Sequence, residues 1–163
     1  MEKEAGIAES AIKQAVEELP DLFLTRLSAQ LSEEDVLASL QSFVTDKPLT
    51  FRPNTLRATE DEVLKEVQSA GMCSTPVPWC PLCHQLTKGT IRELQALQCS
   101  QTDGLYIQSA SSMLAAHALQ VEPEMRVLDM CAAPGSKTSQ IAAMMNNSGM
   151  LVANDRSRKR LYR

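Results

Sequence analysis

The chain has 163 residues, of which 44% are apolar and 22% are charged, a composition typical of a soluble protein with a hydrophobic core. This length suits one domain or two small ones. Residues 1–35 carry nine acidic and three basic side chains, and because the net charge of the whole chain is −4, the remaining residues sum to +2. A weakly basic body behind an acidic leader is compatible with a nucleic-acid partner.

The N-terminal sequence MEKEAGIAES has neither a basic region nor an apolar stretch, which excludes a secretory signal. No segment approaches the roughly 18 apolar residues of a membrane span. We therefore expect an intracellular protein without a membrane partner, cytoplasmic in a bacterium and nuclear or nucleolar if the source is eukaryotic. In that compartment the five cysteines are expected to stay reduced, and their odd number argues against a closed disulfide framework.

Residues 1–48 are predicted to form a small helical cluster. Apolar residues recur at helical spacing over 7–19, and LPDLFLTRL is expected to begin another short helical turn. Ser32 and Asp35 make a capping-box-like start for a further helix, which a break at Pro48 limits.

Residues 49–104 are predicted to form a small α+β module. LTFRPNTLR indicates a short strand that runs into a turn, and LTKGTIRELQALQ indicates the end of a strand and a short turn of helix. Thr59 and Glu62 form a clear capping box at the start of a helix, and Gly71 is a natural cap for the C-terminal end of that helix.

The sequence WCPLCH lies within this module and fits the C-x-x-C-H pattern of haem attachment through Cys80, Cys83 and His84. Covalent haem attachment follows export, for which there is no signal. A structural zinc needs four ligands where this stretch offers three, and a redox C-x-x-C belongs at a helix N-terminus, whereas the nearby prolines favour extended chain. We interpret the stretch as a proline-rich connection without a metal, haem or redox role, replaceable like other surface positions.

Residues 105–163 have the pattern of the first half of a nucleotide-type α/β fold. MRVLDM and MLVAND indicate two short apolar strands of the kind buried in parallel sheets, with a helix over 136–145 between them. GLYIQSASSMLAAHAL indicates a turn and then a helix. The residues of that helix expected to face inward are Met113, Leu114, Ala118 and Leu119.

The loop CAAPGS between the first strand and the helix is the predicted ligand site. A loop at the carboxyl end of a parallel strand lies in the ligand crevice. Gly135 lets the backbone approach a ligand, and the helix that begins near Ser136 presents free N–H groups. Asp155, at the tip of the second strand, is where an acid can accept the hydroxyl hydrogens of a ribose.

Several ligand classes can be considered for this loop. A phosphate-binding P-loop requires glycine where Cys131 and Ser136 stand, and a dinucleotide fingerprint fails because Gly135 is the only glycine in the loop. A single glycine with a distal acid suits a ligand that has a ribose but no pyrophosphate, such as S-adenosylmethionine. A turn that only packs is the remaining alternative.

A family resemblance bears on this choice. VLDMCAAPGSKTSQIA, followed by LVAND, closely resembles the cofactor motif of the Sun-type (Fmu/Nop-like) RNA cytosine-C5 methyltransferases. FRPNTLR resembles their N-terminal R-x-N-T-L element, and GLYIQSASSM resembles the helix that leads into their catalytic domain. LPDLFLTRL and VPWCP are similar to stretches of the bacterial members that modify small-subunit ribosomal RNA. The matches run in order from about residue 19 to residue 160.

The resemblance implies an α/β fold in which 105–163 begin a Rossmann-like methyltransferase domain, truncated after its second strand. The helical cluster 1–48 and the α+β module 49–104 would form an N-terminal RNA-binding region. The implied cofactor is S-adenosylmethionine, and the implied partner is RNA, ribosomal rather than transfer RNA, without a metal. The cofactor would be held by Cys131, Ala132, Ala133, Pro134, Gly135, Ser136, Lys137 and Asp155. RNA contacts would come from Arg52, Asn54 and Arg57.

In that family a cysteine thiolate attacks C6 of the cytosine and a second cysteine assists release. These cysteines lie in Pro-Cys and Thr-Cys motifs further along the family's chains. We therefore expect this chain to be an N-terminal portion without catalytic residues, inactive by itself. The alternatives are a transfer RNA cytosine-C5 methyltransferase and a non-catalytic RNA-binding or assembly protein with a vestigial cofactor loop.

Overall fold

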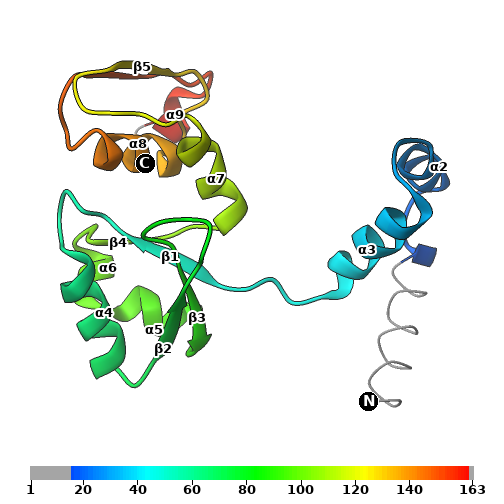
Figure 1. Ribbon diagram of the computed structural model, residues 1–163, viewed down its shortest axis with the longest axis horizontal. Coiled ribbons are helices and arrows are strands. Elements are labelled where there is room, and N and C mark those ends of the chain that lie inside the picture. The colour runs from blue at the N-terminus through cyan, green and yellow to red at the C-terminus, as the bar shows by residue number, and fades with distance from the viewer. Residues whose placement is uncertain (1–15, 162–163) are drawn as a thin grey trace. The chain divides into compact units, whose positions relative to one another are not determined.

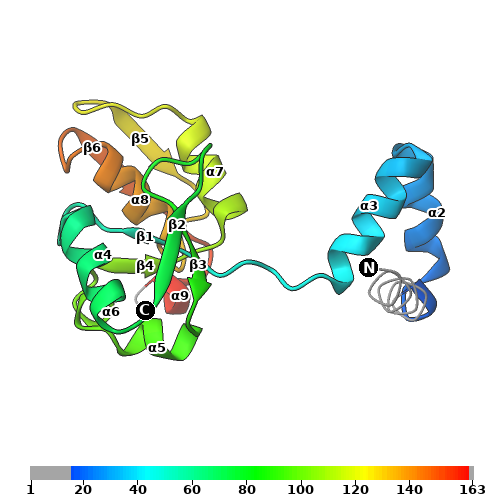
Figure 2. The same ribbon diagram turned by 60° about the horizontal axis from the view of Figure 1, so that its bottom comes forward.

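The computed structural model describes residues 16–161, and the chain divides into two compact units, Met1–Lys47 and Pro48–Arg163. Figures 1 and 2 together label the helices and strands of both units that are described below. The helix expected over 7–19 lies mostly outside the described residues. Among the helices of the described part, none has the length and apolar character needed to cross a bilayer.

The described part of the first unit consists of α2 (Asp21–Gln30) and α3 (Glu33–Val44). The start of α3 is as predicted, since the hydroxyl of Ser32 accepts a hydrogen bond from the backbone N–H of Asp35 at 3.2 Å. LPDLFLTRL forms a longer helix than the expected turn. Leu40 is the buried apolar residue of α3.

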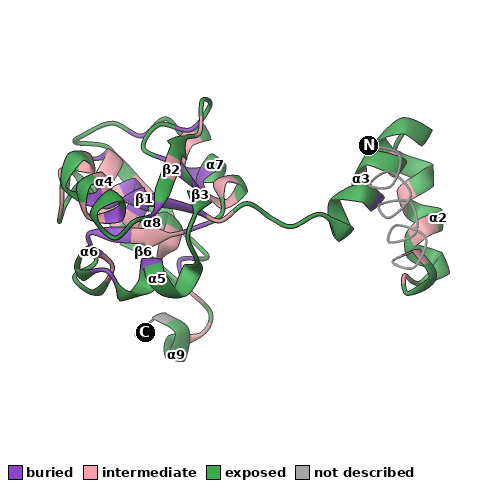
Figure 3. Cartoon of the chain, turned by 90° about the horizontal axis from the view of Figure 1, so that it is seen from below, coloured by how far each residue is buried: buried purple, intermediate pink, exposed green. Residues whose placement is uncertain are grey.

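The second unit begins with a four-stranded antiparallel sheet in the order β2-β3-β1-β4. The first strand in the chain, β1, lies inside the sheet and is buried along its whole length (Figure 3). Two strands were not predicted: β2, in the proline-rich stretch, and β4, before the helix at residue 110. The bounds of the strands are β1 Thr50–Pro53, β2 Cys73–Pro76, β3 His84–Lys88 and β4 Leu105–Ile107.

Three helices pack against this sheet: α4 (Glu60–Ser69), α5 (Ile91–Ala96) and α6 (Gln98–Gln101). The predicted capping box of α4 is confirmed, because Thr59 and Glu62 bond each other's backbone N–H. The helices and the sheet lie side by side in Figures 1 and 2. The apolar core between them contains Phe51, Val63, Val67, Met72, Leu86, Leu94, Leu97, Cys99 and Leu105.

The C-terminal part of this unit is a parallel pair of strands, β5 (Arg126–Asp129) and β6 (Met150–Ala153), as the sequence predicted. The predicted helix between them is α8 (Ser136–Met144), and α7 (Ala110–Ala118) packs against α8. A short helix, α9 (Arg158–Leu161), follows β6. The apolar cluster that joins these elements contains Ala116, Val121, Val127, Ile141, Met145 and Leu151.

The prediction that both strands are buried is wrong for one face of the pair. Leu128 is 58% exposed and Val152 is 49% exposed, whereas Val127 and Leu151 pack against the helix side. Successive side chains of a strand point to opposite faces, and α7 and α8 cover one face only. Two parallel strands thus alternate in burial like strands of a one-sided sheet.

The predicted inward face of α7 is also wrong in part. Met113 is buried as expected, but its partner on the buried face is Ala116, three residues on. Three other residues expected to face inward are exposed: Leu114, Ala118 and Leu119. A narrow contact with α8 covers only one stripe of a helix that is apolar on several sides.

Candidate cofactor-binding site

The loop that follows β5 is fixed at both ends by Asp129, the last residue of that strand. One carboxylate oxygen of Asp129 accepts a hydrogen bond from the backbone N–H of Cys131 at 3.2 Å. The other oxygen accepts from the hydroxyl of Thr138 in α8, at 2.6 Å. Sequence reasoning missed both residues, although an acid at a strand end followed by a hydroxyl residue in the next helix is a readable signal.

The tip of β6 holds the middle of the same loop through Asp155. One oxygen of Asp155 accepts from the backbone N–H of Ala133 at 3.0 Å, and the other accepts from the N–H of Ser157 at 2.8 Å. These hydrogen bonds, the bond from Ser157 first, together with the charge of Arg160 lower the pKa of the Asp155 carboxyl. The same arginine donates to the carbonyl of Ala133 at 2.9 Å.

Backbone hydrogen bonds continue the pairing of the strands into the loop. The N–H of Asn154 donates to the carbonyl of Asp129 at 2.8 Å, and the N–H of Ala132 donates to the carbonyl of Asn154 at 2.9 Å. The structure thus brings together the two predicted parts of the site, the loop and Asp155. Within the loop Ala132 and Ala133 are buried, whereas Cys131 is exposed.

Gly135 ends the loop and precedes the first residue of α8. Its φ of +106° lies in the left-handed region that favours glycine, and an added Cβ would meet no atom within 4 Å. The space beside this glycine is therefore open. It adjoins the first turn of α8, where N–H groups such as those of Ser136 and Lys137 have no partner within the helix. The ammonium group of Lys137 donates to the hydroxyl of Ser112 at 3.0 Å.

An open hollow of about 170 Å³ lies beside this strand end and helix start. Its polar groups are the carboxylate of Asp129 and the ammonium group of Lys137. The rest of its lining is apolar: Ala115, Ala116, Leu119, Leu128, Met130 and Ile141. A hollow with few polar groups and an apolar wall has the chemistry of a small-molecule site.

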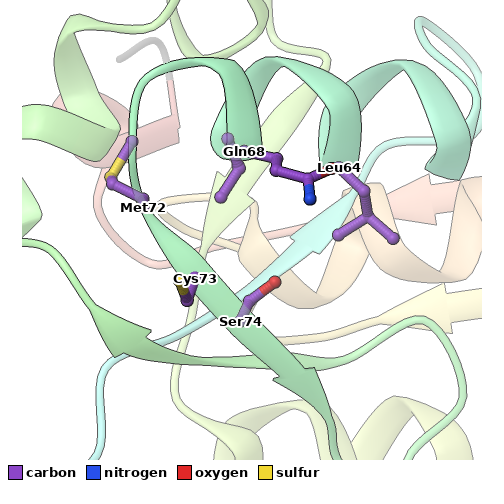
Figure 4. A pocket seen from close by; sticks show the side chains of 6 residues that line it. Leu64, Gln68, Met72, Cys73 and Ser74 are labelled. Atoms are coloured by element: carbon purple, nitrogen blue, oxygen red, sulfur yellow. The ribbon is translucent and has the colours of Figure 1, made fainter.

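A second hollow, of about 360 Å³, lies between α4 and β2 (Figure 4). No charged residue belongs to its lining, which consists of Leu64, Val67, Gln68, Met72, Cys73 and Ser74. It contains none of the predicted site residues. The loop after β5 is therefore the better candidate for ligand binding.

The three predicted RNA-binding residues occupy different environments. Arg52 is only 3% exposed, and its guanidinium donates to Gln108, Ser136 and Ser139 inside the fold. The Asn54 side chain is also buried and donates to the carbonyl of Asp103 at 2.8 Å.

Both side chains are buried and already make hydrogen bonds within the fold, and the RNA contacts predicted for Arg52 and Asn54 stay predictions. Arg57 is exposed, and its RNA contact stays a prediction.

The WCPLCH stretch lies only partly at the surface, where Trp79 and Leu82 are exposed. Cys80 and Cys83 are each 1% exposed and form an apolar cluster with Met113. Burial raises the pKa of Cys83 to about 12, which keeps it a neutral thiol. His84 is buried as well and bonds Glu60 at 2.8 Å. The expectation that these positions can be replaced like surface residues is therefore wrong. Within 16–161 no group of three His, Cys, Asp or Glu residues is arranged to hold a metal ion.

Known proteins are similar to this chain over the segment that contains the loop after β5. The family model of the 16S rRNA methyltransferase RsmB/F matches residues 116–163, which include the loop, α8 and Asp155. The ribosomal RNA small subunit methyltransferase F of Aeromonas salmonicida is 41% identical over 154 residues, and that of Vibrio campbellii is 40% identical over 152 residues. Each match covers 88% of this chain and 31% of the relative.

The fold has a relative among solved structures. A methyltransferase homologue from Pyrococcus horikoshii is 32% identical, with a TM-score of 0.80, and the match covers 94% of this chain and 50% of that one. This likeness confirms the α/β fold class predicted from the sequence. The chain spans about a third of the length of the curated relatives that it matches. In sequence and in fold, the chain is similar to part of the 16S rRNA methyltransferases of the RsmB/F type.

Proposed function

We propose that this chain forms the N-terminal, cofactor-binding part of an S-adenosylmethionine-dependent RNA cytosine-C5 methyltransferase that modifies small-subunit ribosomal RNA in the cytoplasm. The observation that carries the proposal is the loop after β5, held by Asp155, within the segment that matches the family model. The names of the relatives favour ribosomal over transfer RNA as the substrate.

The loop residues suit S-adenosylmethionine better than a ligand rich in phosphate. A carboxylate has about four lone-pair sites, and Asp155 uses one oxygen for the N–H of Ala133 in the loop and the other for the N–H of Ser157, which leaves acceptor sites for ribose hydroxyls. Open space at Gly135 admits a ligand close to the backbone. The loop from Cys131 to Lys137 supplies one ammonium group, whereas P-loops surround phosphates with several backbone N–H groups and glycines.

When bound, S-adenosylmethionine supplies the methyl group for transfer. The part of this chain is to hold the ligand: the N–H groups of α8 would face its polar end and Asp155 its ribose. The apolar wall of the hollow at Leu119 and Leu128 would exclude water from one side.

The organisation of the enzyme follows from these assignments. We propose that 1–48 form a helical region, that 49–104 form an RNA-binding module, and that 105–163 begin the methyltransferase domain. The exposed Arg57, next to the turn after β1, is the candidate for RNA contact in the module.

Calorimetric titration tests the ligand class. S-adenosylmethionine is titrated against the chain beside ATP and NAD, which represent the phosphate and dinucleotide alternatives. We expect binding of S-adenosylmethionine alone, and its loss in Gly135→Val. Lys88→Ala, an exposed position on β3, is the matched control. Binding of ATP or NAD in place of S-adenosylmethionine would contradict the proposal.

A further inference from the structure

The strand β1 carries a buried cation that has no carboxylate partner among residues 16–161. Arg52 is 3% exposed, and burial lowers its pKa to about 10, which still leaves the guanidinium charged at neutral pH. The ring of Tyr106, its pairing partner on β4, lies 5.0 Å from the guanidinium carbon. A charged group at such a position needs well-placed hydrogen bonds to offset the loss of water.

The hydrogen bonds of Arg52 point in two directions. Its Nε donates to the side-chain oxygen of Gln108 at 3.1 Å, directly after β4 of its own sheet. Its Nη2 donates to the carbonyl of Ser136 at 3.1 Å and to the hydroxyl of Ser139 at 2.8 Å. Both acceptors lie in the first turn of α8, immediately after Gly135 of the loop.

A relay of two amide side chains strengthens this connection. The amide nitrogen of Gln108 donates to the side-chain oxygen of Gln140 at 3.2 Å, and the nitrogen of Gln140 donates to the carbonyl of Met113 at 3.1 Å. Thr50 on β1 donates to the carbonyl of Gln108 at 2.6 Å. The network therefore joins β1, the chain after β4, α7 and α8. No buried side-chain polar atom of the described residues lacks a partner.

We propose that Arg52 is a positioning residue that fixes the first turn of α8, and with it the cofactor loop, to the sheet of the N-terminal module. The role in cofactor binding rests on the proposed function, whereas the contact between Arg52 and α8 does not. A planar fork with donors on two sides can bond Gln108 and Ser139 together. Lysine carries its donors on one nitrogen, so it keeps the charge but cannot bond both sides.

Hydrogen–deuterium exchange of the 163-residue chain without ligand tests the link. The amide of Ser139, which bonds the carbonyl of Gly135 at 2.8 Å, reports on the first turn of α8. In Arg52→Met and Arg52→Lys we expect its exchange to accelerate roughly tenfold or more. The amides of Val63 and Val67, in the core of α4, should exchange at an unchanged rate.

Control variants separate positioning from general destabilisation. Arg92→Met removes an exposed arginine of α5 and should leave every rate unchanged. Ser139→Ala removes one of the two α8 acceptors of Arg52 and leaves the arginine in place. It therefore tests the link even if Arg52 variants unfold, which fast exchange in α4 would reveal. Unchanged exchange around Ser139 in a folded Arg52 variant or in Ser139→Ala would overturn the proposal.

A second measurement tests the consequence for the cofactor. If the unchanged chain binds S-adenosylmethionine, Arg52→Met and Ser139→Ala should each weaken binding, and the double variant should lose less than the product of the two effects because both remove one contact. Independent effects would overturn the role in cofactor binding. Failure of the unchanged chain to bind would count against the proposed function, while exchange at Ser139 would still decide the link.

Discussion

The carboxylate of Asp155 accepts a hydrogen bond from the backbone N–H of Ala133 at 3.0 Å, so the tip of β6 holds the loop that follows β5. The Asp155 carboxylate thus stabilises the loop even without a bound ligand. The same carboxylate also bonds the N–H of Ser157, at the start of the next segment. Loss of Asp155 should therefore act on the shape of the loop as well as on contacts with a ligand.

Replacement of Asp155 by alanine should weaken S-adenosylmethionine binding far more than RNA binding. The loss removes charge-assisted hydrogen bonds to a ribose and releases Ala133, so we expect a fall in cofactor affinity of roughly tenfold to a thousandfold. Gly135→Val should act similarly, because a branched side chain at a φ of +106° is strained and fills the open space. Calorimetric titration of each variant measures both effects.

Lys137→Ala is the comparison within the same loop. Its ammonium group is exposed and bonds Ser112, so its removal should reduce cofactor affinity less than either of the other changes. Wild-type affinity in Asp155→Ala together with lost binding in Lys137→Ala would refute the ribose assignment and favour a phosphate-bearing ligand.

The loop contact of Asp155 should depend on pH in the acid range only. Hydrogen bonds from Ser157 and Ala133 favour the ionised form and hold the pKa of this carboxyl below its usual value. A carboxyl whose pKa is lower in the folded than in the unfolded chain stabilises the folded state at every pH above its unfolded pKa. That stability is lost as the pH falls through the folded pKa, here below about pH 4. The amide chemical shifts of Ala133 and Ser157 should titrate together in this range by NMR. An amide transition of Ala133 above about pH 5 would contradict this assignment, and Asp155→Asn should abolish the transition.

Simultaneous replacement of Cys83 by serine and His84 by glutamine should destabilise the fold without loss of any metal. A hydroxyl in the buried cluster of Cys80, Cys83 and Met113 costs about 1–3 kcal/mol unless it finds a partner. The histidine ring also stacks on Phe51, with centroids 5.5 Å apart. Urea denaturation gives the change in unfolding free energy, and Cys73→Ser on the exposed strand β2 is the control. Stoichiometric zinc or haem in the purified chain, absent from the double variant, would restore the metal hypothesis.

The cysteines should fall into two classes of reactivity. Cys73 and Cys131 are exposed, whereas Cys80, Cys83 and Cys99 are buried. Burial raises the pKa of Cys83 and of Cys99 to about 12, so these groups remain thiols at neutral pH. A thiol reagent at pH 8 should modify the exposed pair rapidly in the native chain and all five cysteines in denaturant. Rapid native modification of Cys83 would show that its cluster opens.

The 163-residue chain alone should transfer no methyl group to RNA. Thr-Cys, one of the two cysteine motifs that the family resemblance implies, does not occur in this sequence, and the Pro-Cys-like context WCPLC lies before the cofactor loop. Incubation with small-subunit ribosomal RNA and labelled S-adenosylmethionine, followed by nucleoside analysis, measures the product. Formation of 5-methylcytosine by the purified chain, with contaminating enzyme excluded by a Gly135→Val preparation, would disprove this reading.

Local sequence signals predicted much of the fold correctly. Ser32 and Thr59 cap helices because each hydroxyl accepts a hydrogen bond from the backbone N–H three residues on, and residue types at such a short spacing are visible in the sequence itself. The strand, loop and helix around Gly135 were equally readable, since the pattern of apolar residues changes period at each boundary.

Contacts between distant residues could not be predicted in this way. Arg52 was expected to contact RNA. In the fold it is buried, and the acceptors of its hydrogen bonds lie 56 to 87 residues further along the chain. The burial of Cys80 and Cys83, in the connection between β2 and β3, likewise depends on Met113 from α7. Polar and thiol side chains look the same in a sequence whether they face water or a partner brought by the fold.

The strand order β2-β3-β1-β4 determines when the sheet can be completed during synthesis of the chain. Strand β1 lies between β3 and β4, so Phe51 pairs first with His84 and then with Ile107. Strand β4, which contains Ile107, is the last strand of this sheet to be synthesised. Ser139, an acceptor for Arg52, is synthesised 87 residues after it, which at about 5–20 residues per second takes on the order of ten seconds. Strand β1 is thus the unpaired edge of the nascent sheet until β4 is made, and Arg52 lacks its α8 acceptors until the segment that carries the cofactor loop has left the ribosome.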